Sequence, residues 1–397
     1  MKKKHLKLLL FVFILSLGCR GPKSEEIKVE KKSKVLPTVT ALPKDVIAPK
    51  NNPASVAKEE LGKLLFYDPI LSGNKDISCA TCHHPEMGYA EFLDISIGTN
   101  AKGLGSKRKF NSPNNIPFVK RNAQTILNTA FNGLQSHRKY SPEDAPMFWD
   151  DRVESLEDQA LEPIKALEEM RGRSFTEDEI LNVVTKRLRS IEKYQNLFRD
   201  AFKEQESITV ENLGKAIAAF ERTLVTNNSR FDQYMRGDGS AISIREKDGF
   251  ELFKKVGCIN CHNGPMFSDY KMHVLGAPEN SKLTTMDIGV ADVNLKDSFA
   301  FRTPSLRNLR FTAPYMHNGS FMTLRRVLEF YEDISNNIQR NPNIEPSQFD
   351  PFVRELELTV KEMALIIAFL NTLNDDDFDK SIPESVPSGL PVGGLIN

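Results

Sequence analysis

Apolar residues recur at helical spacing in several segments of this chain. Segments 55–66 and 213–224 place apolar side chains three or four residues apart, as an amphipathic helix does. Segments 176–188 and 359–370 begin with Thr-x-x-Glu, a capping box that commonly opens a helix. Sustained alternation of apolar and polar residues, which would indicate a half-buried strand, is scarce. The pattern predicts a mainly α-helical protein with little sheet.

The first 19 residues show a different pattern, which is typical of an export signal. Lysines at positions 2, 3, 4 and 7 precede an apolar run from Leu8 to Leu17, too short to span a bilayer as a stable helix. The run ends at Gly18 and Cys19, which resemble a bacterial lipobox, with Ser16 where that motif usually has leucine. We therefore expect residues 1–19 to be a signal peptide with a lipobox. The mature protein would lie in the periplasm or on the outside face of the cell envelope, with lipidated Cys19 as a membrane tether; ordinary cleavage nearby is the alternative.

Composition divides the rest of the chain. Residues 20–52 are rich in Lys, Glu, Val and Pro without a helical or strand period, which predicts a flexible tether. A glycine-rich break at 236–240 indicates a boundary between two domains, 53–235 and 236–380, joined by short linkers. The last segment, 381–397, contains three prolines and is expected to form an irregular tail.

Charge bears on the choice of partner. The chain has 53 basic and 53 acidic side chains, and without the four lysines of the first segment 49 basic side chains remain. This mild acidic excess argues against nucleic acid as a partner. It is compatible with a small basic electron-donor protein.

Two copies of Cys-x-x-Cys-His carry the most informative chemistry. In this spacing two thiols can add across the vinyl groups of a haem, and the histidine reaches the iron. A zinc knuckle or a redox Cys-x-x-Cys is the alternative, but a zinc ribbon needs its pairs closer together and a thioredoxin-type motif needs no histidine. Four of the five cysteines lie in the two motifs. We therefore expect two covalently bound haem c groups, held by Cys79, Cys82, His83, Cys258, Cys261 and His262.

The segments around these motifs resemble the bacterial dihaem cytochrome c peroxidase and MauG superfamily. The resemblance runs from residue 53 to about 373 and is strongest in segments 61–72, 78–83, 121–132, 148–152, 302–308 and 312–319. It implies two cytochrome c-like domains, each wrapped on one haem. The first would reduce hydrogen peroxide to water. The second would pass on electrons from a small donor protein, a cytochrome c or a cupredoxin.

The resemblance also implies roles at the first haem. Glu169 would be the acid/base for O–O cleavage and Gln159 its hydrogen-bonding helper. We expect Pro163 to interrupt the helix, so that both side chains face one cavity. Without the resemblance, Glu168 and Glu169 would be interpreted as a solvated helix face. Many relatives close this haem with a second histidine, but Thr99 stands at that place, so we expect a vacant or water-filled sixth site.

At the second haem, the resemblance places Tyr331 opposite His262, where peroxidases of the family generally have methionine. A phenolate ligand stabilises ferric iron; the alternative is a packed Tyr331 with Met316 or Met322 as the ligand. Trp149, the only tryptophan in the chain, would be a stepping stone for electrons between the haems, or simply a core aromatic. A calcium ion would be held by Asn122, Thr312 and Pro314.

Two other functions compete with peroxide reduction by an electron donor. A MauG-like enzyme would use peroxide to oxidise a protein or a small substrate. Thr99 and Tyr331 favour this activity, whereas the single tryptophan argues against it. A non-catalytic dihaem electron carrier is the third possibility, and the Gln159/Glu169 pair argues against it. A homodimer is a further expectation.

Overall fold

The computed structural model describes residues 37–135, 139–290 and 297–396. The expected signal peptide, Cys19 and residues 20–36 lie outside the described residues. Residues from Pro37 onward belong to one compact unit. Among the described residues, none of the helices combines the length and the apolar character that crossing a bilayer would require.

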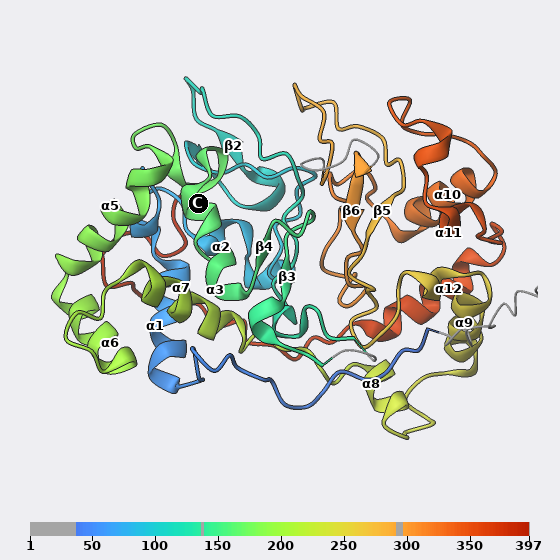
Figure 1. Cartoon of the computed structure of the whole chain (residues 1–397), viewed down its shortest axis with the longest axis horizontal. Helices are drawn as coiled ribbons and strands as arrows, with labels where there is room; N and C mark the ends of the chain where they lie inside the picture. Colours follow the sequence, from blue (N-terminus) through green and yellow to red (C-terminus); the bar gives the residue numbers. More distant parts are fainter. Residues whose placement is uncertain (1–36, 136–138, 291–296, 397) are drawn as a thin grey trace, which may run out of the picture. The chain divides into compact units, whose positions relative to one another are not determined.

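Helices dominate the described chain, and sheet is limited to three short antiparallel pairs (Figure 1). The helices are α1 (Val56–Tyr67), α2 (Cys79–Cys82), α3 (Leu156–Gln159), α4 (Glu162–Lys165), α5 (Glu177–Arg189), α6 (Glu192–Phe202), α7 (Val210–Glu221), α8 (Arg230–Met235), α9 (Ile244–Lys255), α10 (Leu324–Ser335), α11 (Pro351–Arg354) and α12 (Met363–Leu370), with one π-helical turn, η6 (Leu167–Arg171). The 3-10 turns are η1 (Pro69–Leu71), η2 (Pro85–Met87), η3 (Gly105–Lys107), η4 (Thr129–Phe131), η5 (Pro142–Asp144), η7 (Cys258–Asn260), η9 (Pro346–Gln348) and η10 (Asn371–Leu373). The paired strands are β1 (Ala101–Lys102) with β2 (Lys109–Phe110), β3 (Pro146–Met147) with β4 (Val153–Glu154), and β5 (Met272–Val274) with β6 (Ala300–Arg302). The prediction of a mainly helical fold with little sheet is confirmed.

The helices expected from apolar spacing are present, but one of them begins later in the sequence than expected. Segments 55–66, 176–188 and 213–224 correspond to α1, α5 and α7. The capping box at Thr359 forms, since its backbone N–H donates to Glu362 Oε2 at 3.0 Å, but α12 begins only at Met363. The box closes a turn that precedes the helix, which the sequence pattern does not distinguish from a helical first turn.

Each half of the chain is built on a close helix pair that crosses at a glycine. Gly62 of α1 lies so near α7 that a Cβ there would fall 1.9 Å from Ala216 O. Gly249 of α9 faces α12 in the same way, with a Cβ 2.2 Å from Leu365 O. Only glycine permits backbones to approach this closely. The two pairs form the centres of two separate hydrophobic cores.

The change from one core to the other occurs before the expected domain boundary. Apart from the C-terminal tail, the residues of the first core end at Leu224, whereas Phe231 of α8 already packs in the second core, in T-shaped contact with Phe250, Phe267 and Phe369. Packing thus groups α8 with the second core, whereas the expected boundary at 235/236 groups it with the first half. The glycine-rich break at 236–240 is a turn between α8 and α9. Turn residues indicate where a loop lies, but they do not indicate which hydrophobic core the neighbouring helices join.

Each end of the described chain packs against the half of the molecule that is more distant from it in sequence. Residues 37–52, expected to be a flexible tether, instead pack with Val39 in the second core, and Leu42 N donates to Asp232 Oδ1 at 2.9 Å. This part of the prediction is wrong, because buried apolar side chains without a period leave no helical or strand signal. Figure 1 shows this blue segment passing from α1 to α8.

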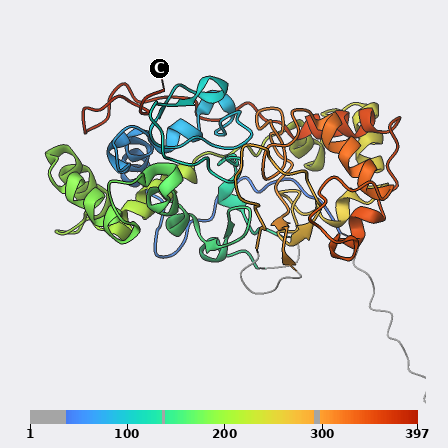
Figure 2. The same cartoon turned by 90° about the horizontal axis from the view of Figure 1, so that it is seen from above.

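Residues 381–396, the expected tail, contain no helix or paired strand and pack against the first half. Val386 is buried in the first core, and Ser388 Oγ donates to Asp68 Oδ1 at 2.6 Å. Gly393 N donates to Tyr67 O at 2.8 Å. Figure 2 shows the red tail beside the blue and cyan segments of the first half.

Candidate active site

Both Cys-x-x-Cys-His motifs line one cavity of about 730 Å³. Its wall takes residues from both halves of the chain. Among the residues expected from the sequence, those in the wall are Cys82, His83, Asn122, Trp149, Gln159, Glu169, Cys258, Cys261, His262, Thr312, Pro314 and Tyr331. Cys79 is not in the wall and packs against the first core. Residues spread over most of the sequence are thus brought to one place.

The first motif is set on the short helix α2, where Ser78 N–H donates to Thr81 Oγ1 at 3.0 Å and Thr81 N–H donates to Ser78 O at 3.0 Å. His83 follows directly, and its Nδ1 lies 3.1 Å from Tyr89 O. A carbonyl oxygen can only accept, so this contact puts the ring proton on Nδ1 and leaves Nε2 with a free lone pair. Burial lowers the pKa of His83, which keeps the ring neutral.

The second motif repeats this arrangement on η7. His262 Nδ1 lies 3.0 Å from Phe267 O, and burial again lowers the pKa of the ring. Histidines that bind a metal through one nitrogen characteristically donate the other N–H to a carbonyl or a carboxylate. In both histidines Nε2 therefore keeps a lone pair that could bind a haem iron.

The cysteines suit thioether links better than a thiolate metal site. Burial raises the pKa of Cys79 and of Cys258 to about 12, and it raises the pKa of Cys82 well above its usual value. Zinc ligation needs thiolates, which this burial opposes, whereas addition to haem vinyl groups leaves an uncharged thioether. The cavity, the neutral histidines and the buried thiols together fit two haem c groups.

Glu169 reaches the cavity from the π-helical turn η6. After α3 the chain breaks, and Pro163 lies in the first turn of α4, so Gln159 and Glu169 lie on separate elements while both line the cavity. Burial, reinforced by repulsion from Glu168, raises the pKa of Glu169 to about 7. A carboxyl group with that pKa can both accept and give up a proton near neutral pH.

The segment 95–99 is fixed against Glu169. Thr99 N donates to Glu169 O at 2.8 Å, and a Cβ on Gly98 would fall 2.4 Å from the same oxygen. The Thr99 hydroxyl donates to Asp76 Oδ1 at 2.9 Å, and Thr99 is not part of the cavity wall. The Thr99 side chain is thus engaged in a hydrogen bond within the protein and does not face the cavity.

Tyr331 projects from α10 near the second motif. Burial raises the pKa of its phenol, and the neighbouring Cys261 and Cys258 add to the effect. Of the two methionines weighed against it, Met322 is 55% exposed and outside the cavity wall, whereas Met316 lines the cavity. Of the three residues weighed as ligands at the second haem, Tyr331 and Met316 line the cavity.

Trp149 lies in the cavity wall within an aromatic cluster. Its Nε1 donates to Asn122 O at 3.0 Å. Its ring meets His317 edge-on at 6.5 Å, and His317 stacks on Phe301 with ring centroids 3.7 Å apart. Burial lowers the pKa of His317 to about 3, so this imidazole is neutral.

Comparison with known proteins agrees with this geometry. The family model for di-haem cytochrome c peroxidases matches residues 56–240. The chain is 34% identical to the methylamine utilization protein MauG of Methylorubrum extorquens, over 86% of this chain and 85% of that protein. It is 32% identical to the cytochrome c551 peroxidase of Nitrosomonas europaea, over 85% of each chain. The chain belongs to the di-haem cytochrome c peroxidase family.

A solved structure gives the same result for the fold of this di-haem peroxidase. The crystal structure of a MauG-like protein associated with microbial copper homeostasis aligns with a TM-score of 0.67 and 28% identity, covering 84% of this chain and 95% of that one. The protein is a peroxidase-type oxidoreductase, and its family carries two haem groups. The names of the relatives include both cytochrome c peroxidases and MauG proteins.

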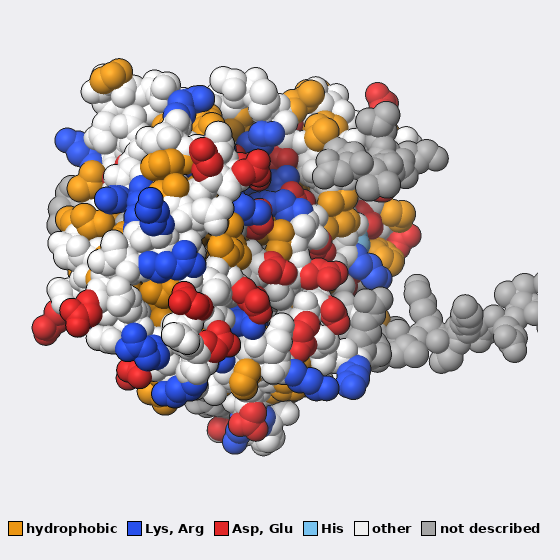
Figure 3. Space-filling view, turned by 60° about the vertical axis from the view of Figure 1, so that its left-hand side comes forward, with side chains coloured by type: hydrophobic (Ala, Val, Ile, Leu, Met, Phe, Trp, Pro, Cys, Tyr) orange, Lys and Arg blue, Asp and Glu red, His pale blue; other side chains and the backbone are white. Residues whose placement is uncertain are grey.

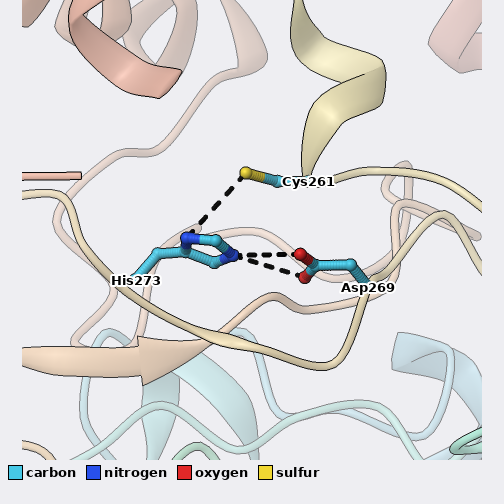
Figure 4. A group of neighbouring side chains, drawn as sticks. All are labelled: Cys261, Asp269 and His273. Carbon is cyan, nitrogen blue, oxygen red and sulfur yellow. Dashed lines mark hydrogen bonds and ion pairs between the residues drawn. The ribbon is translucent and has the colours of Figure 1, made fainter. Parts of the chain in front are cut away.

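The sequence analysis did not identify a charged histidine, His273, beside the second Cys-x-x-Cys-His motif. His273 lies between Asp350, at 2.6 Å from its Nδ1, and Asp269, at 3.2 Å from its Nε2. Figure 4 shows His273 with Asp269 and Cys261. Burial alone would lower the pKa of His273, but Asp269, Cys261 and Asp350 outweigh it and raise the pKa to about 11. An imidazolium therefore lies 4.0 Å from Cys261 Sγ. Nothing in the isolated sequence around His273 signals this pairing.

The structure also pairs Asp151, in the segment 148–152, with Arg302. Asp151 Oδ1 lies 2.8 Å from Arg302 Nε. Burial, with Asp150 and Glu154 adding repulsion, raises the pKa of Asp151 to about 7 against the opposing effect of Arg302. The pair joins residues far apart in sequence, so no local pattern could have indicated it.

The three expected calcium ligands all line the cavity. Asn122 Nδ2 donates to Leu93 O at 2.6 Å, so its amide oxygen is the atom it can offer to a cation. Oxygen ligands of this kind suit calcium.

Proposed function

We propose that this protein reduces hydrogen peroxide to water at the first haem, with electrons that enter through the second haem from a small cytochrome c or cupredoxin donor. The balance is one peroxide, two electrons and two protons to two water molecules. Bound haem supplies the redox chemistry at its iron. The chain must supply an open face at the first haem, proton transfer, and a route for single electrons.

Glu169 carries this proposal. It lines the same cavity as His83 and Gln159, and its pKa of about 7 suits a group that takes a proton from one peroxide oxygen and returns it to the other. Gln159 would hold the peroxide by hydrogen bonding. Thr99, engaged with Asp76, leaves the first haem without a second protein ligand from segment 95–99.

The test is the variant Glu169→Gln, which keeps the shape of the side chain and removes its acid/base function. We expect peroxide turnover with reduced donor to fall by roughly 100-fold or more, with both haems still attached. Glu168→Gln is the matched control, because it removes the neighbouring charge and should retain most of the turnover. Wild-type turnover in Glu169→Gln would refute the role of Glu169.

A MauG-like oxidation of a protein or small substrate is the second candidate, and Tyr331 favours it. A tyrosinate on the second haem would stabilise higher oxidation states of the pair. Stopped-flow spectra of the diferric protein mixed with peroxide separate the possibilities. A long-lived species two oxidation levels up favours the MauG-like activity, rapid turnover with reduced cytochrome c favours the peroxidase, and no reaction favours an electron carrier.

We further propose export to the periplasm and anchoring through lipidated Cys19, supported by the pattern of the first 19 residues. Calcium at Asn122, Thr312 and Pro314 is supported by the oxygen atoms these residues offer. On the face shown in Figure 3, basic and acidic side chains are interspersed. The donor surface and the homodimer stay predictions.

A further inference from the structure

The turn that carries Trp149 is unusually constrained. Phe148 and Asp151, on either side of the 149–150 pair, both adopt positive φ angles, +66° and +51°. Such angles are uncommon outside glycine, although aspartate and asparagine tolerate them better than most residues. Segment 148–152 is therefore a tight turn. Trp149, within this turn, lines the cavity that both motifs also line.

Arg302, at the end of β6 in the second half, forms two hydrogen bonds to the backbone of this turn. Its backbone N–H donates to Trp149 O at 2.8 Å, and its Nε–H donates to Phe148 O at 2.8 Å. The Arg302 side chain is only 5% exposed. A buried guanidinium is thus held directly beside the backbone of Trp149.

Two buried arginines, Arg121 and Arg302, lie beside this turn. They differ in the number of carboxylates that pair with their positive charge. Arg121 pairs with Asp287 and with Asp150, each at 2.6 Å. Among the described residues, the carboxylate paired with Arg302 is Asp151. Because the Nε proton of Arg302 is directed at Phe148 O, the contact with Asp151 is an attraction between charges more than a hydrogen bond. Without Asp151, the buried guanidinium of Arg302 would lose its paired carboxylate, with Asp150 left as a weaker source of negative charge.

The charge of Arg302 would affect the indole of Trp149 if the indole lost an electron. Its Nε1–H donates to Asn122 O, a backbone carbonyl, which is far too weak a base to take the proton. An oxidised indole here would keep its proton and carry a positive charge. The free energy of forming it then depends directly on nearby charges, which are poorly screened in a buried site.

We propose that Asp151 is a positioning residue for electron passage between the haems: by neutralising Arg302, it makes removal of an electron from Trp149 less costly. Trp149 gives one electron to the oxidised first site and regains one from the second, so the indole is unchanged overall. This inference rests on the proposed function, in which electrons reach the first haem through Trp149.

The test compares Asp151→Asn with the wild type at about pH 8, above the pKa of about 7 of Asp151. Asparagine keeps the shape and tolerates the positive φ. After peroxide is mixed with protein whose second haem is reduced, oxidation of that haem should be about tenfold slower in the variant, as an uncompensated buried charge would cause. Haem content and both reduction potentials should be unchanged. Glu154→Gln, which removes an exposed charge from β4, is the matched control and should behave as wild type.

The double variant Asp151→Asn/Arg302→Gln separates charge from structure. If Asp151 acts by neutralising Arg302, removing both charges restores the rate. A double variant that stays as slow as Asp151→Asn overturns the electrostatic role, as does a wild-type rate in Asp151→Asn. Asp151→Gly, which also accepts the positive φ, replaces Asp151→Asn if that variant does not fold.

Trp149→Phe distinguishes failure of this inference from failure of the proposed route. A slow Trp149→Phe with a wild-type rate in Asp151→Asn overturns the inference alone. An unimpaired Trp149→Phe overturns both the inference and the passage of electrons through Trp149.

Discussion

At the scale of single residues, Glu169 owes its raised pKa to where it is buried. Burial, with repulsion from the adjacent Glu168, raises the pKa of Glu169 to about 7. The π-helical turn directs it into the cavity, and removal from water disfavours its charged form. The same glutamate on a regular, exposed helix would titrate near its ordinary pKa.

This raised pKa predicts the pH dependence of peroxide turnover. If Glu169 first accepts a proton from peroxide, its ionised form is active, and kcat/KM should rise with pH through about 7. Glu168→Gln removes the repulsion that contributes to the raised pKa, so the midpoint should move to lower pH. A pH profile of kcat/KM for both proteins measures this, and an unmoved midpoint in Glu168→Gln would contradict the assignment of the limb to Glu169.

Tyr331 gives a second prediction at this scale. Tyr331→Met should raise the reduction potential of the second haem, because a thioether stabilises ferrous iron relative to a phenolate. Met316→Leu is the control and should leave the potential unchanged if Tyr331 is the ligand. Spectroelectrochemistry and electron paramagnetic resonance of the resting protein provide the measurement. A change in Met316→Leu and none in Tyr331→Met would identify Met316 as the ligand.

At the scale of elements, the helix pair α1–α7 stabilises the first core and thereby the first motif. Its closeness depends on Gly62, whose missing side chain lets the backbones meet. Phe66 of α1 packs against Phe220 of α7, with ring centroids 5.2 Å apart, and also against Tyr89. Tyr89 in turn holds His83 through its carbonyl oxygen. The orientation of His83, the expected iron ligand, therefore depends on helix packing.

Gly62→Ala should consequently destabilise the protein by about 3 kcal/mol, because an overpacked helix contact costs more than alanine gains in helix propensity. Gly239→Ala is the control. Its site has nothing within 4 Å of the added Cβ, and the change should be neutral. Thermal unfolding followed by circular dichroism measures both variants. Equal stabilities would mean that α1 and α7 can separate without cost.

At the scale of the whole molecule, the halves exchange their ends. The segment that precedes α1 packs on the second core, and the tail that follows α12 packs on the first. Thr81, inside the first motif, donates to Gly393 O of the tail at 2.8 Å. The tail of the second half thus completes the surroundings of the first haem motif.

Removal of residues 386–397 should lower the stability of the first half by on the order of 5 kcal/mol, since it exposes the apolar surface that Val386, Leu390 and Val392 cover. Ile382→Ala, at a site that is 43% exposed, is the control and should have little effect. Thermal unfolding and limited proteolysis around the first motif measure the difference. A truncated protein with unchanged melting and protection would show that the tail only rests on the surface.

The sequence by itself determined the features that are local. Five consecutive residues suffice to specify each haem attachment site, and apolar spacing suffices for α1, α5 and α7, because these depend on neighbours a few positions away. Tertiary structure alone decided which glutamate has a raised pKa, that 37–52 is packed, that α8 belongs to the second core, and that Asp151 meets Arg302. These depend on burial and on contacts between distant segments, and free energies of burial and charge pairing are not encoded in any short stretch of sequence.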